Sequence, residues 1–385
     1  MSKSRSSPRT AKPAARAVQR SVADLCAAMN NLAPLKLAQS WDNVGLLTGD
    51  LRAGVGRVLL TIDLTAPVVR EAIEKRADVI VAYHPPIFKP VSRLIASGSG
   101  MDALVHKCIR AGIAIYSPHT ALDAADGGTN DVLAGLCGLR QTEPIEYVDD
   151  LRGEECKFVV FVPHAEVEKV AEAIFSAGGG HIGNYSQCSF RIPGEGTFFG
   201  ADSTNPSVGE RGHLERVEEL RLESVVPFSR LPAVIAAMRK AHAYEEPAFD
   251  VYPLKARPVR GIGRVGRFAK SVTLSALARR LRSVTRSTNV QVIGDPGQRI
   301  EEAVVVAGAA GDLPFRTSLT PCHVVVTGEI RHHDALTYER VGCAAIALGH
   351  WTSERLVLKP LAARLNKVLG VATTVSATDR DPFLR

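Results

Sequence analysis

Short apolar runs rich in valine and isoleucine alternate with helix-forming segments in the first part of the chain. The runs at residues 57–62, 78–82 and 113–116 have the length of strands, and helical patterns at residues 67–75 and 102–111 separate them. Strands that are apolar on both faces and alternate with helices are typical of a largely parallel sheet. This feature predicts an α/β fold.

The α/β pattern is interrupted once. Residues 151–257 predict the order β-α-β-β-α-β, in which residues 187–192 and 196–199 could form a hairpin. That order indicates an inserted ferredoxin-like α+β module of about 100 residues. We therefore expect an α/β body in two halves, residues 21–150 and 258–385, with the module between them.

Charge is concentrated at the start of the chain. The 385 residues include 47 Lys+Arg and 40 Asp+Glu, which gives a net charge of +7. Residues 1–20 hold six of the basic residues and no acid, so 41 basic and 40 acidic residues remain in the body. We predict a disordered basic tail, with organelle targeting as an alternative that Pro8 and Pro13 disfavour. The near-neutral body argues against a specific nucleic-acid-binding face.

The cysteines and the apolar runs bear on the compartment. Seven cysteines are scattered without a CxxC pair, which is typical of reduced thiols in a cytoplasmic protein. No apolar run approaches the roughly 18 residues of a membrane span. We expect a cytoplasmic protein that does not enter a membrane.

Histidines and carboxylates follow four of the predicted strands. The candidate residues are His84 after the second strand, His119 and Asp123 after the third, His332 after the strand at 323–327, and His350 and Glu354 after the strand at 344–348. Ligands bind at the carboxyl ends of strands in open α/β sheets. Imidazole nitrogens and carboxylate oxygens together suit Zn²⁺, Fe²⁺ or Mn²⁺. A single such histidine is more often a hydrogen-bonded structural residue, but four such strand ends in one chain indicate a metal site.

Three further motifs leave alternatives open. Residues 261–266 fit GxGxxG, but they follow a linker with no strand before them and no acid about 20 residues later, so we favour a glycine-rich strand. Residues 242–247 (HAYEEP) fit a metal or regulatory site, and also a helix end with a solvated acidic turn, which we favour. Asp42 either hydrogen-bonds a ligand histidine or holds its loop.

Six motifs, in order, resemble the Nif-three-like dinuclear metal-centre family, whose members are also named GTP cyclohydrolase I type 2 homologues. The motifs are residues 40–46 (SWDNVGL), 83–88 (YHPPIF), 117–123 (SPHTALD), 127–131 (GGTND), 327–333 (TGEIRHH) and 349–354 (GHWTSE). The end of the chain, residues 376–382 (SATDRDP), resembles eukaryotic-type members. The segment at 242–254 resembles the PII- or CutA-like module inserted in longer bacterial members.

The resemblance implies a two-lobed α/β body that binds one or two divalent ions of zinc, iron or manganese and assembles as a homo-hexamer. By position, the ligands are His84, Asp123, His350 and Glu354. The family usually has a second histidine where this chain has Tyr83, and a neutral phenol binds divalent metals poorly. The second metal is therefore in question. His119 and His332, like Tyr83, are candidates for supporting or substitute ligands.

Three functions follow as hypotheses. The first is a metal-dependent hydrolase acting on a nucleotide, in which hydroxide attacks C8 of guanine and Glu354 or His119 relays protons. The second is a non-catalytic metal-binding or regulatory hexamer whose insert senses a small molecule, which Tyr83 favours. The third is a transcription-related interaction protein, which the near-neutral body disfavours.

Overall fold

The computed structural model describes residues 20–148, 155–254 and 259–383, which form two compact units. Unit 1 contains the residues up to Val148 and from Val259 onward, and unit 2 contains those between Asp149 and Pro258. The predicted basic tail up to residue 19, the polar joint at 149–150 and residues 255–258 lie outside the described residues. The tail was predicted to reach residue 20, but Arg20 pairs with Val55 in a short strand.

The first half of unit 1 is built on a five-stranded sheet. Its strand order is β19 (Ala372–Val375), β4 (Arg57–Thr61), β5 (Val79–Ala82), β6 (Ala114–Ser117) and β2 (Gly45–Thr48). The first four strands run parallel, and β2 is an antiparallel edge strand. The C-terminal strand β19 therefore completes a sheet that the N-terminal part of the chain begins.

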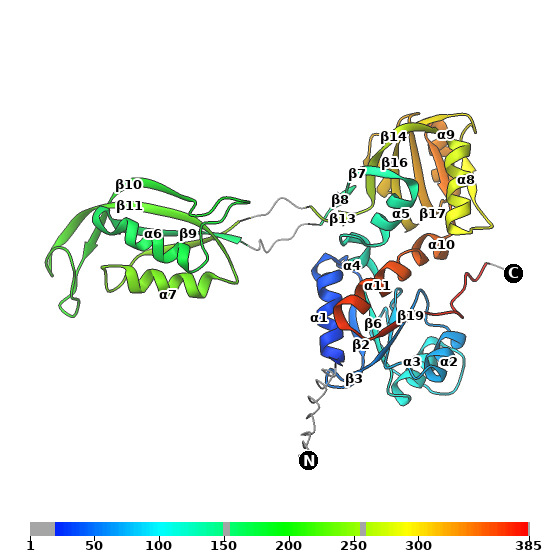
Figure 1. Ribbon diagram of the computed structural model, residues 1–385, viewed down its shortest axis with the longest axis horizontal. Coiled ribbons are helices and arrows are strands. Elements are labelled where there is room, and N and C mark those ends of the chain that lie inside the picture. The colour runs from blue at the N-terminus through cyan, green and yellow to red at the C-terminus, as the bar shows by residue number, and fades with distance from the viewer. Residues whose placement is uncertain (1–19, 149–154, 255–258, 384–385) are drawn as a thin grey trace, which may run out of the picture. The chain divides into compact units, whose positions relative to one another are not determined.

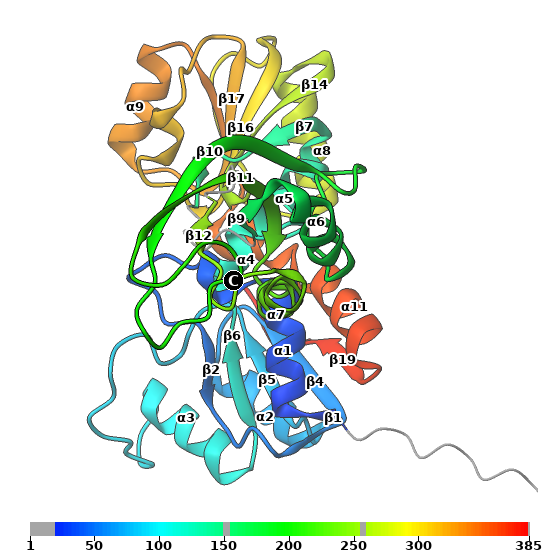
Figure 2. The same cartoon turned by 90° about the vertical axis from the view of Figure 1, so that its left-hand side faces the viewer.

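Helices cover both faces of this sheet (Figures 1 and 2). Because side chains alternate along a strand, Val58 and Leu60 pack with α1 (Val22–Leu32) and α11 (Leu358–Leu369), whereas Leu59 packs on the opposite face. The opposite face carries α2 (Ala66–Glu74) and α3 (Met101–Arg110). The burial of both faces explains why the strands read as continuous apolar runs.

The second half of unit 1 is a six-stranded mixed sheet. Its order is β15 (Gln291–Ile293), β18 (Ala344–Ala347), β17 (His323–Glu329), β16 (Arg299–Ala309), β14 (Arg264–Thr273) and β7 (Leu139–Glu143). Only β16, β17 and β18 run parallel, so the predicted largely parallel arrangement holds only for the centre of this sheet. Residues 261–266 form β13 (Gly261–Ile262) and the start of β14, which confirms the glycine-rich strand.

Two pairs of helices connect the sheets of unit 1. The chain passes from the first sheet to the second through α4 (His119–Ala124) and α5 (Thr129–Cys137), and returns through α10 (His350–Arg355) and α11. Helix α5 packs on the second sheet beside α8 (Leu274–Thr285). On the other face lies α9 (His332–Arg340), through Tyr338. The residues that follow β5 in the first sheet therefore lie close to α10, the helix that follows β18 in the second sheet.

Buried Asp379 fixes the position of α10. Its carboxylate accepts hydrogen bonds from Ile62 N at the end of β4 (3.1 Å), from Trp351 Nε1 (3.0 Å) and from the Arg355 guanidinium. Two of these donors lie on α10 and the third on the first sheet. One carboxylate in the C-terminal segment therefore ties the helix of the second sheet to a strand of the first.

Unit 2 is a four-stranded antiparallel sheet with two helices on one face. The elements in chain order are β9 (Glu155–Pro163), α6 (Val167–Ser176), β10 (Ser189–Phe199), β11 (Leu214–Pro227), α7 (Leu231–Ala241) and β12 (Phe249–Pro253). The strand order is β10-β11-β9-β12, and α6 and α7 pack against Phe158, Val160 and Leu222. The assignment of this unit as ferredoxin-like stays a prediction.

The predicted hairpin within residues 187–199 is wrong. β10 runs without a break from Ser189 to Phe199 and pairs residue by residue with β11. Pro193 and two glycines in this stretch have the composition of a turn. Because β10 is an edge strand, a proline without an N–H group is tolerated there.

The remaining elements are short. They are β1 (Arg20–Ser21), β3 (Gly54–Val55), β8 (Glu146–Tyr147) and the 3₁₀ helices η1 (Leu35–Leu37), η2 (His164–Glu166) and η3 (Leu313–Arg316). Among the described residues, none of the helices has the length and apolar character needed to cross a membrane.

Candidate metal centre

His84, His350 and Glu354 form a group in unit 1 that could hold a metal ion. One ligand atom from each lies within 4.8 Å of the other two. His84 follows β5, whereas His350 and Glu354 lie one turn apart on α10. His350 Nε2 is 3.0 Å from Glu354 Oε1, and His84 Nε2 is 3.3 Å from Glu354 Oε2. Two imidazoles and a carboxylate from opposite halves of the chain thus converge on one point.

Glycines at two strand ends allow α10 to lie this close to the sheet. Gly308, in β16, has φ +65°, and a Cβ there would collide with Glu354 Oε1. A Cβ at Gly328, in β17, would lie 2.6 Å from Ser353 Oγ. That hydroxyl instead accepts a hydrogen bond from Gly308 N (2.9 Å). The glycines at 308 and 328 therefore allow the strands to approach α10 more closely than residues with a Cβ would.

Two further carboxylates lie beside the histidines. Asp63 Oδ1 is hydrogen-bonded to His84 Nδ1 at 2.9 Å, whereas Glu329 Oε1 makes a looser ion-pair contact with His350 Nδ1 at 3.4 Å. A partner on Nδ1 fixes the ring and leaves Nε2 as the ligand atom. Neither carboxylate was among the site residues predicted from the sequence. Asp63 directly follows the strand predicted at 57–62, so the same strand-end criterion could have identified it.

Mutual contacts perturb the titration of the group. Burial alone would lower the pKa of His84, but Asp63 and Glu354 outweigh it and raise this pKa to about 10. The hydrogen bond to Glu354 raises the pKa of His350. Burial would raise the pKa of Glu354, but the two histidines hold it below its usual value. The buried carboxylate and the two imidazoles therefore stabilise one another's charged forms.

Asp123 is not part of this group, because it is paired with Tyr83. The buried Tyr83 hydroxyl donates a hydrogen bond to Asp123 Oδ1 over 2.5 Å. Burial and the carboxylates of Asp123 and Glu354 raise the pKa of Tyr83 well above its ordinary value. Burial also raises the pKa of Asp123 to about 6. A phenol that stays protonated is a donor to Asp123 and not a ligand.

His119 lies at the edge of the group. Its ring centroid is 5.3 Å from that of His84 and 5.6 Å from that of Tyr83. Asp42 Oδ1 is 2.9 Å from His119 Nδ1, while Asp42 Oδ2 accepts hydrogen bonds from the backbone and hydroxyl of Thr120. Asp42 therefore both orients a histidine and holds the turn. The φ of His119, 23°, is rare for a non-glycine residue and is fixed by these contacts.

His332 is placed differently. It is exposed at the start of α9, and its ring contacts that of His333 at 5.5 Å. Among the described residues, its only ring contact is with this neighbour, and it is not within the group that could hold a metal.

The donor set fits one divalent ion. Glu354 Oε2 is buried and makes no hydrogen bond of good geometry within the described chain, although His84 Nε2 is near it. An acceptor in that state is costly unless a cation or donor satisfies it. The second ion of a dinuclear centre fits poorly, because Tyr83 supplies a proton to Asp123 where a second imidazole would supply a lone pair.

A small cavity opens beside the group. It has a volume of about 170 Å³, and its lining includes Ala310, Gly311, Glu329 and Arg331. Glu329 also contacts His350, so the cavity adjoins the candidate ligands. A concave space next to polar groups is the usual setting of a ligand site.

Together, the two sheets of unit 1 and the histidine–carboxylate group between them define an α/β protein with a candidate metal centre. Comparison with known proteins specifies the family. The sequence model of the Duf34/NIF3 (NGG1p interacting factor 3) family matches residues 20–382. The chain belongs to this family, which confirms the resemblance drawn from its motifs.

Relatives match over most of their length. A Bacillus subtilis protein named GTP cyclohydrolase 1 type 2 homolog is 37% identical over 357 residues, covering 91% of this chain and 94% of the relative. A Mycobacterium tuberculosis protein of the same name is 37% identical over 340 residues, covering 86% and 88%. The crystal structure of a Bacillus cereus protein related to NIF3 is 34% identical with a TM-score of 0.75, covering 95% and 99%.

Proposed function

We propose that this chain is a divalent-metal-dependent hydrolase that acts on a nucleotide. The observation that carries the proposal is the convergence of His84, His350 and Glu354 on one point. Two imidazoles and one carboxylate are a common ligand set of hydrolytic zinc sites and of Fe²⁺ or Mn²⁺ sites. The nucleotide substrate is suggested by the name that relatives carry, GTP cyclohydrolase 1 type 2 homolog.

His84, His350 and Glu354 would hold the ion, which would lower the pKa of a bound water to about 7 and so make hydroxide available at neutral pH. Glu354 belongs to the ligand set, so His119 is the better candidate of the two proton relays considered. Asp42 holds its Nδ1, and Nε2 makes no hydrogen bond within the described chain. An imidazole oriented by a carboxylate through one nitrogen can take and return a proton through the other.

Turnover of GTP by metal-loaded protein tests this function. Protein purified without a histidine tag is stripped, reloaded with Zn²⁺, Mn²⁺ or Fe²⁺, and incubated with GTP and a panel of other nucleotides. We expect product above the metal-stripped control and its loss in His350→Ala. Bound metal without turnover of any nucleotide would contradict the hydrolase.

The second candidate is a non-catalytic metal-binding or regulatory protein. The hydrogen bond between Tyr83 and Asp123 favours it, because it withdraws a carboxylate from the ligand set. Two results together would support this candidate. The protein would bind metal without turning over any nucleotide, and the insert would bind a small molecule.

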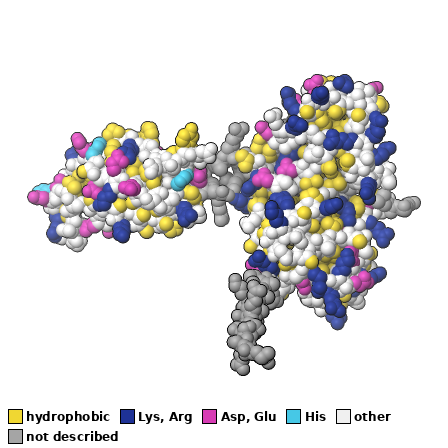
Figure 3. All heavy atoms as spheres, viewed as in Figure 1, with side chains coloured by type: hydrophobic (Ala, Val, Ile, Leu, Met, Phe, Trp, Pro, Cys, Tyr) yellow, Lys and Arg dark blue, Asp and Glu magenta, His cyan; other side chains and the backbone are white. Residues whose placement is uncertain are grey.

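Assembly and the nature of the insert are also proposals. We propose a homo-hexamer and a PII- or CutA-like insert, both from the family resemblance. Light scattering of the purified chain tests the hexamer, and a monomer would contradict it. Nucleic acid is a poor partner for the body. On the face of unit 1 in Figure 3, basic side chains are scattered among uncharged ones and form no continuous stripe.

A further inference from the structure

Unit 2 contains a cavity of its own, far in sequence from the metal ligands. It has a volume of about 230 Å³ and lies between the sheet, the loop after β10 and the turn after α7. A cavity of roughly 150 Å³ can hold benzene, so this space suits one ring with a short chain. Asn205 N donates a hydrogen bond to Glu245 Oε1 (3.0 Å), which ties the loop to the turn beside the cavity.

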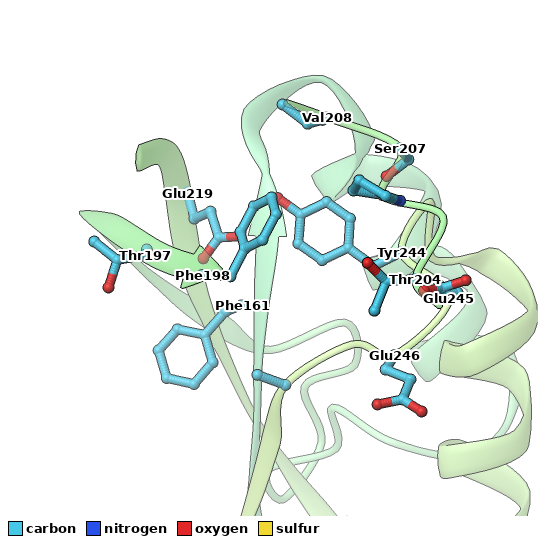
Figure 4. A pocket seen from close by; sticks show the side chains of 13 residues that line it. Phe161, Thr197, Phe198, Thr204, Ser207, Val208, Glu219, Tyr244, Glu245 and Glu246 are labelled. Carbon is cyan, nitrogen blue, oxygen red and sulfur yellow. The ribbon is translucent and has the colours of Figure 1, made fainter. Parts of the chain in front are cut away.

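Aromatic rings form much of the wall. Phe161 of β9, Phe198 of β10 and Tyr244 of the turn line the cavity, and Figure 4 shows Tyr244 in the middle of the labelled side chains. Ring faces carry partial negative charge and attract organic cations. The wall is therefore suited to a cation with an apolar body.

The charged groups of the lining are all acidic. Glu219, Glu245 and Glu246 line the cavity, and no lysine or arginine is among the lining residues. Glu219 lies so close to Gly196 that a Cβ there would collide with its carboxylate. Arg221 shares the strand face with Glu219 but pairs with Glu223 (2.8 Å), so it does not neutralise Glu219. The cavity thus keeps an uncompensated negative charge.

The Tyr244 hydroxyl lies beside the Glu219 carboxylate. Its oxygen is buried and makes no hydrogen bond of good geometry within the described chain. Burial and the nearby Glu219 carboxylate raise the pKa of Tyr244, and in Figure 4 the hydroxyl points toward Phe198, on the side of Glu219. A bound ammonium group that donates hydrogen bonds to the hydroxyl oxygen and to the carboxylate would satisfy both groups. The Tyr244 hydroxyl, the Glu219 carboxylate and the aromatic rings therefore all favour the same kind of ligand, an organic cation.

A bare metal ion does not fit this lining. Among the described residues, the group of histidines, cysteines and carboxylates close enough to share an ion is the one in unit 1. The carboxylates of Glu219, Glu245 and Glu246 do not converge in that way. An organic ammonium group needs one carboxylate and a ring face, not a full coordination shell.

We propose that the cavity of unit 2 is a binding site for a small organic ammonium ion, held by Glu219, the Tyr244 hydroxyl and the rings of Phe161 and Phe198. This assigns to the turn at residues 242–247 a ligand-binding role in place of the purely solvated acidic turn that its sequence favoured. The site does not depend on the metal centre or on the proposed hydrolase.

Ligand-observed NMR titration of the full chain with phenethylammonium tests the proposal, with 2-phenylethanol as the neutral analogue. We expect saturable binding of the amine and at least about tenfold weaker binding of the alcohol, because only the amine forms a charged hydrogen bond. Glu219→Gln should weaken binding of the amine about tenfold or more. Tyr244→Phe should also weaken binding of the amine, although it keeps the aromatic ring. The control is Glu218→Gln, because Glu218 neighbours Glu219 but is exposed and does not line the cavity.

Four results would overturn the proposal. The first is no saturable binding of the amine to folded wild type, and the second is equal binding of amine and alcohol. The third is equal weakening of amine binding by Glu219→Gln and Glu218→Gln. The fourth is displacement of the amine by excess Mg²⁺, because the cavity would then be a metal site. Circular dichroism of each variant shows whether it is folded, and Tyr244→Phe carries the test if Glu219→Gln does not fold.

Discussion

The Tyr83 hydroxyl donates a hydrogen bond to Asp123 Oδ1 across 2.5 Å, at the position where the family resemblance led us to expect a second histidine. We expect this contact to limit how many ions the candidate centre can hold. It engages a carboxylate that a second ion would need, and it places a protonated phenol where a lone pair is required.

Tyr83→His should therefore increase the number of bound ions. We expect one divalent ion per chain in wild type and two in the variant, because the imidazole frees Asp123 and adds a ligand. Metal content by mass spectrometry after loading and desalting measures this. Tyr83→Phe is the control, since it frees Asp123 without adding a ligand. Two ions in wild type would show that another group completes the second site.

Asp63 should contribute to metal affinity without touching the ion. It holds His84 Nδ1 at 2.9 Å, and loss of such a partner typically lowers affinity by about 10–100-fold. Competition titration with a chromophoric chelator should show this loss in Asp63→Ala and a smaller one in Asp63→Asn, which can still accept the hydrogen bond. If both variants bind like wild type, Asp63 does not orient His84.

Gly308→Ala should abolish metal binding through a steric effect. A Cβ at this position would meet Glu354 Oε1 and come within 3.3 Å of His350 Nε2. Gly311→Ala is a matched control, because it also has a positive φ (+55°) but nothing within 4 Å of the added atom. Both variants should lose about 1 kcal/mol of stability for the backbone conformation. Equal metal affinity in the two variants would show that α10 can move away.

Glu71 should make the stability of the fold depend on pH. Burial alone would raise its pKa, but hydrogen bonds from Ala377 N, Lys75, Ser376 and Thr378 hold that pKa well below the usual 4.5 of a glutamate. The carboxylate therefore stabilises the folded chain at pH above about 4.5, and this contribution falls away as the pH drops further.

Urea unfolding measures the contribution of Glu71. Glu71→Gln should cost about 2 kcal/mol or more at pH 7, because hydrogen bonds to a charged acceptor are lost. The difference from wild type should shrink as the pH falls below about 4.5. Glu74→Gln, at an exposed position of the same helix, should change little at either pH. If Glu71→Gln lowers the free energy of unfolding by the same amount at every pH, the packing of the side chain and not its charge would account for the loss.

Polar residues at the ends of predicted strands identified much of the candidate metal centre. The apolar runs ending at Ala82 and near Leu348 placed His84, His350 and Glu354 at the ligand-binding edge, and the structure brings these three together. The spacing of His350 and Glu354 is a local property of one helix, so it could be read without a structure. Asp63 satisfied the same criterion and was missed, since only histidine-bearing strand ends were considered.

Other features depended on contacts across long sequence separations. No local pattern reveals that Tyr83 donates to Asp123, that Asp379 ties α10 to β4, or that β19 joins the first sheet. The turn at residues 242–247 read as solvated because its lining partners, Phe161, Phe198 and Glu219, come from three different strands. The alternating α/β body, the family and the types of donor could all be predicted from local patterns and motifs. Which donors converge could not, because convergence depends on the packing of segments that are far apart in the sequence, and local periodicity carries no information about that packing.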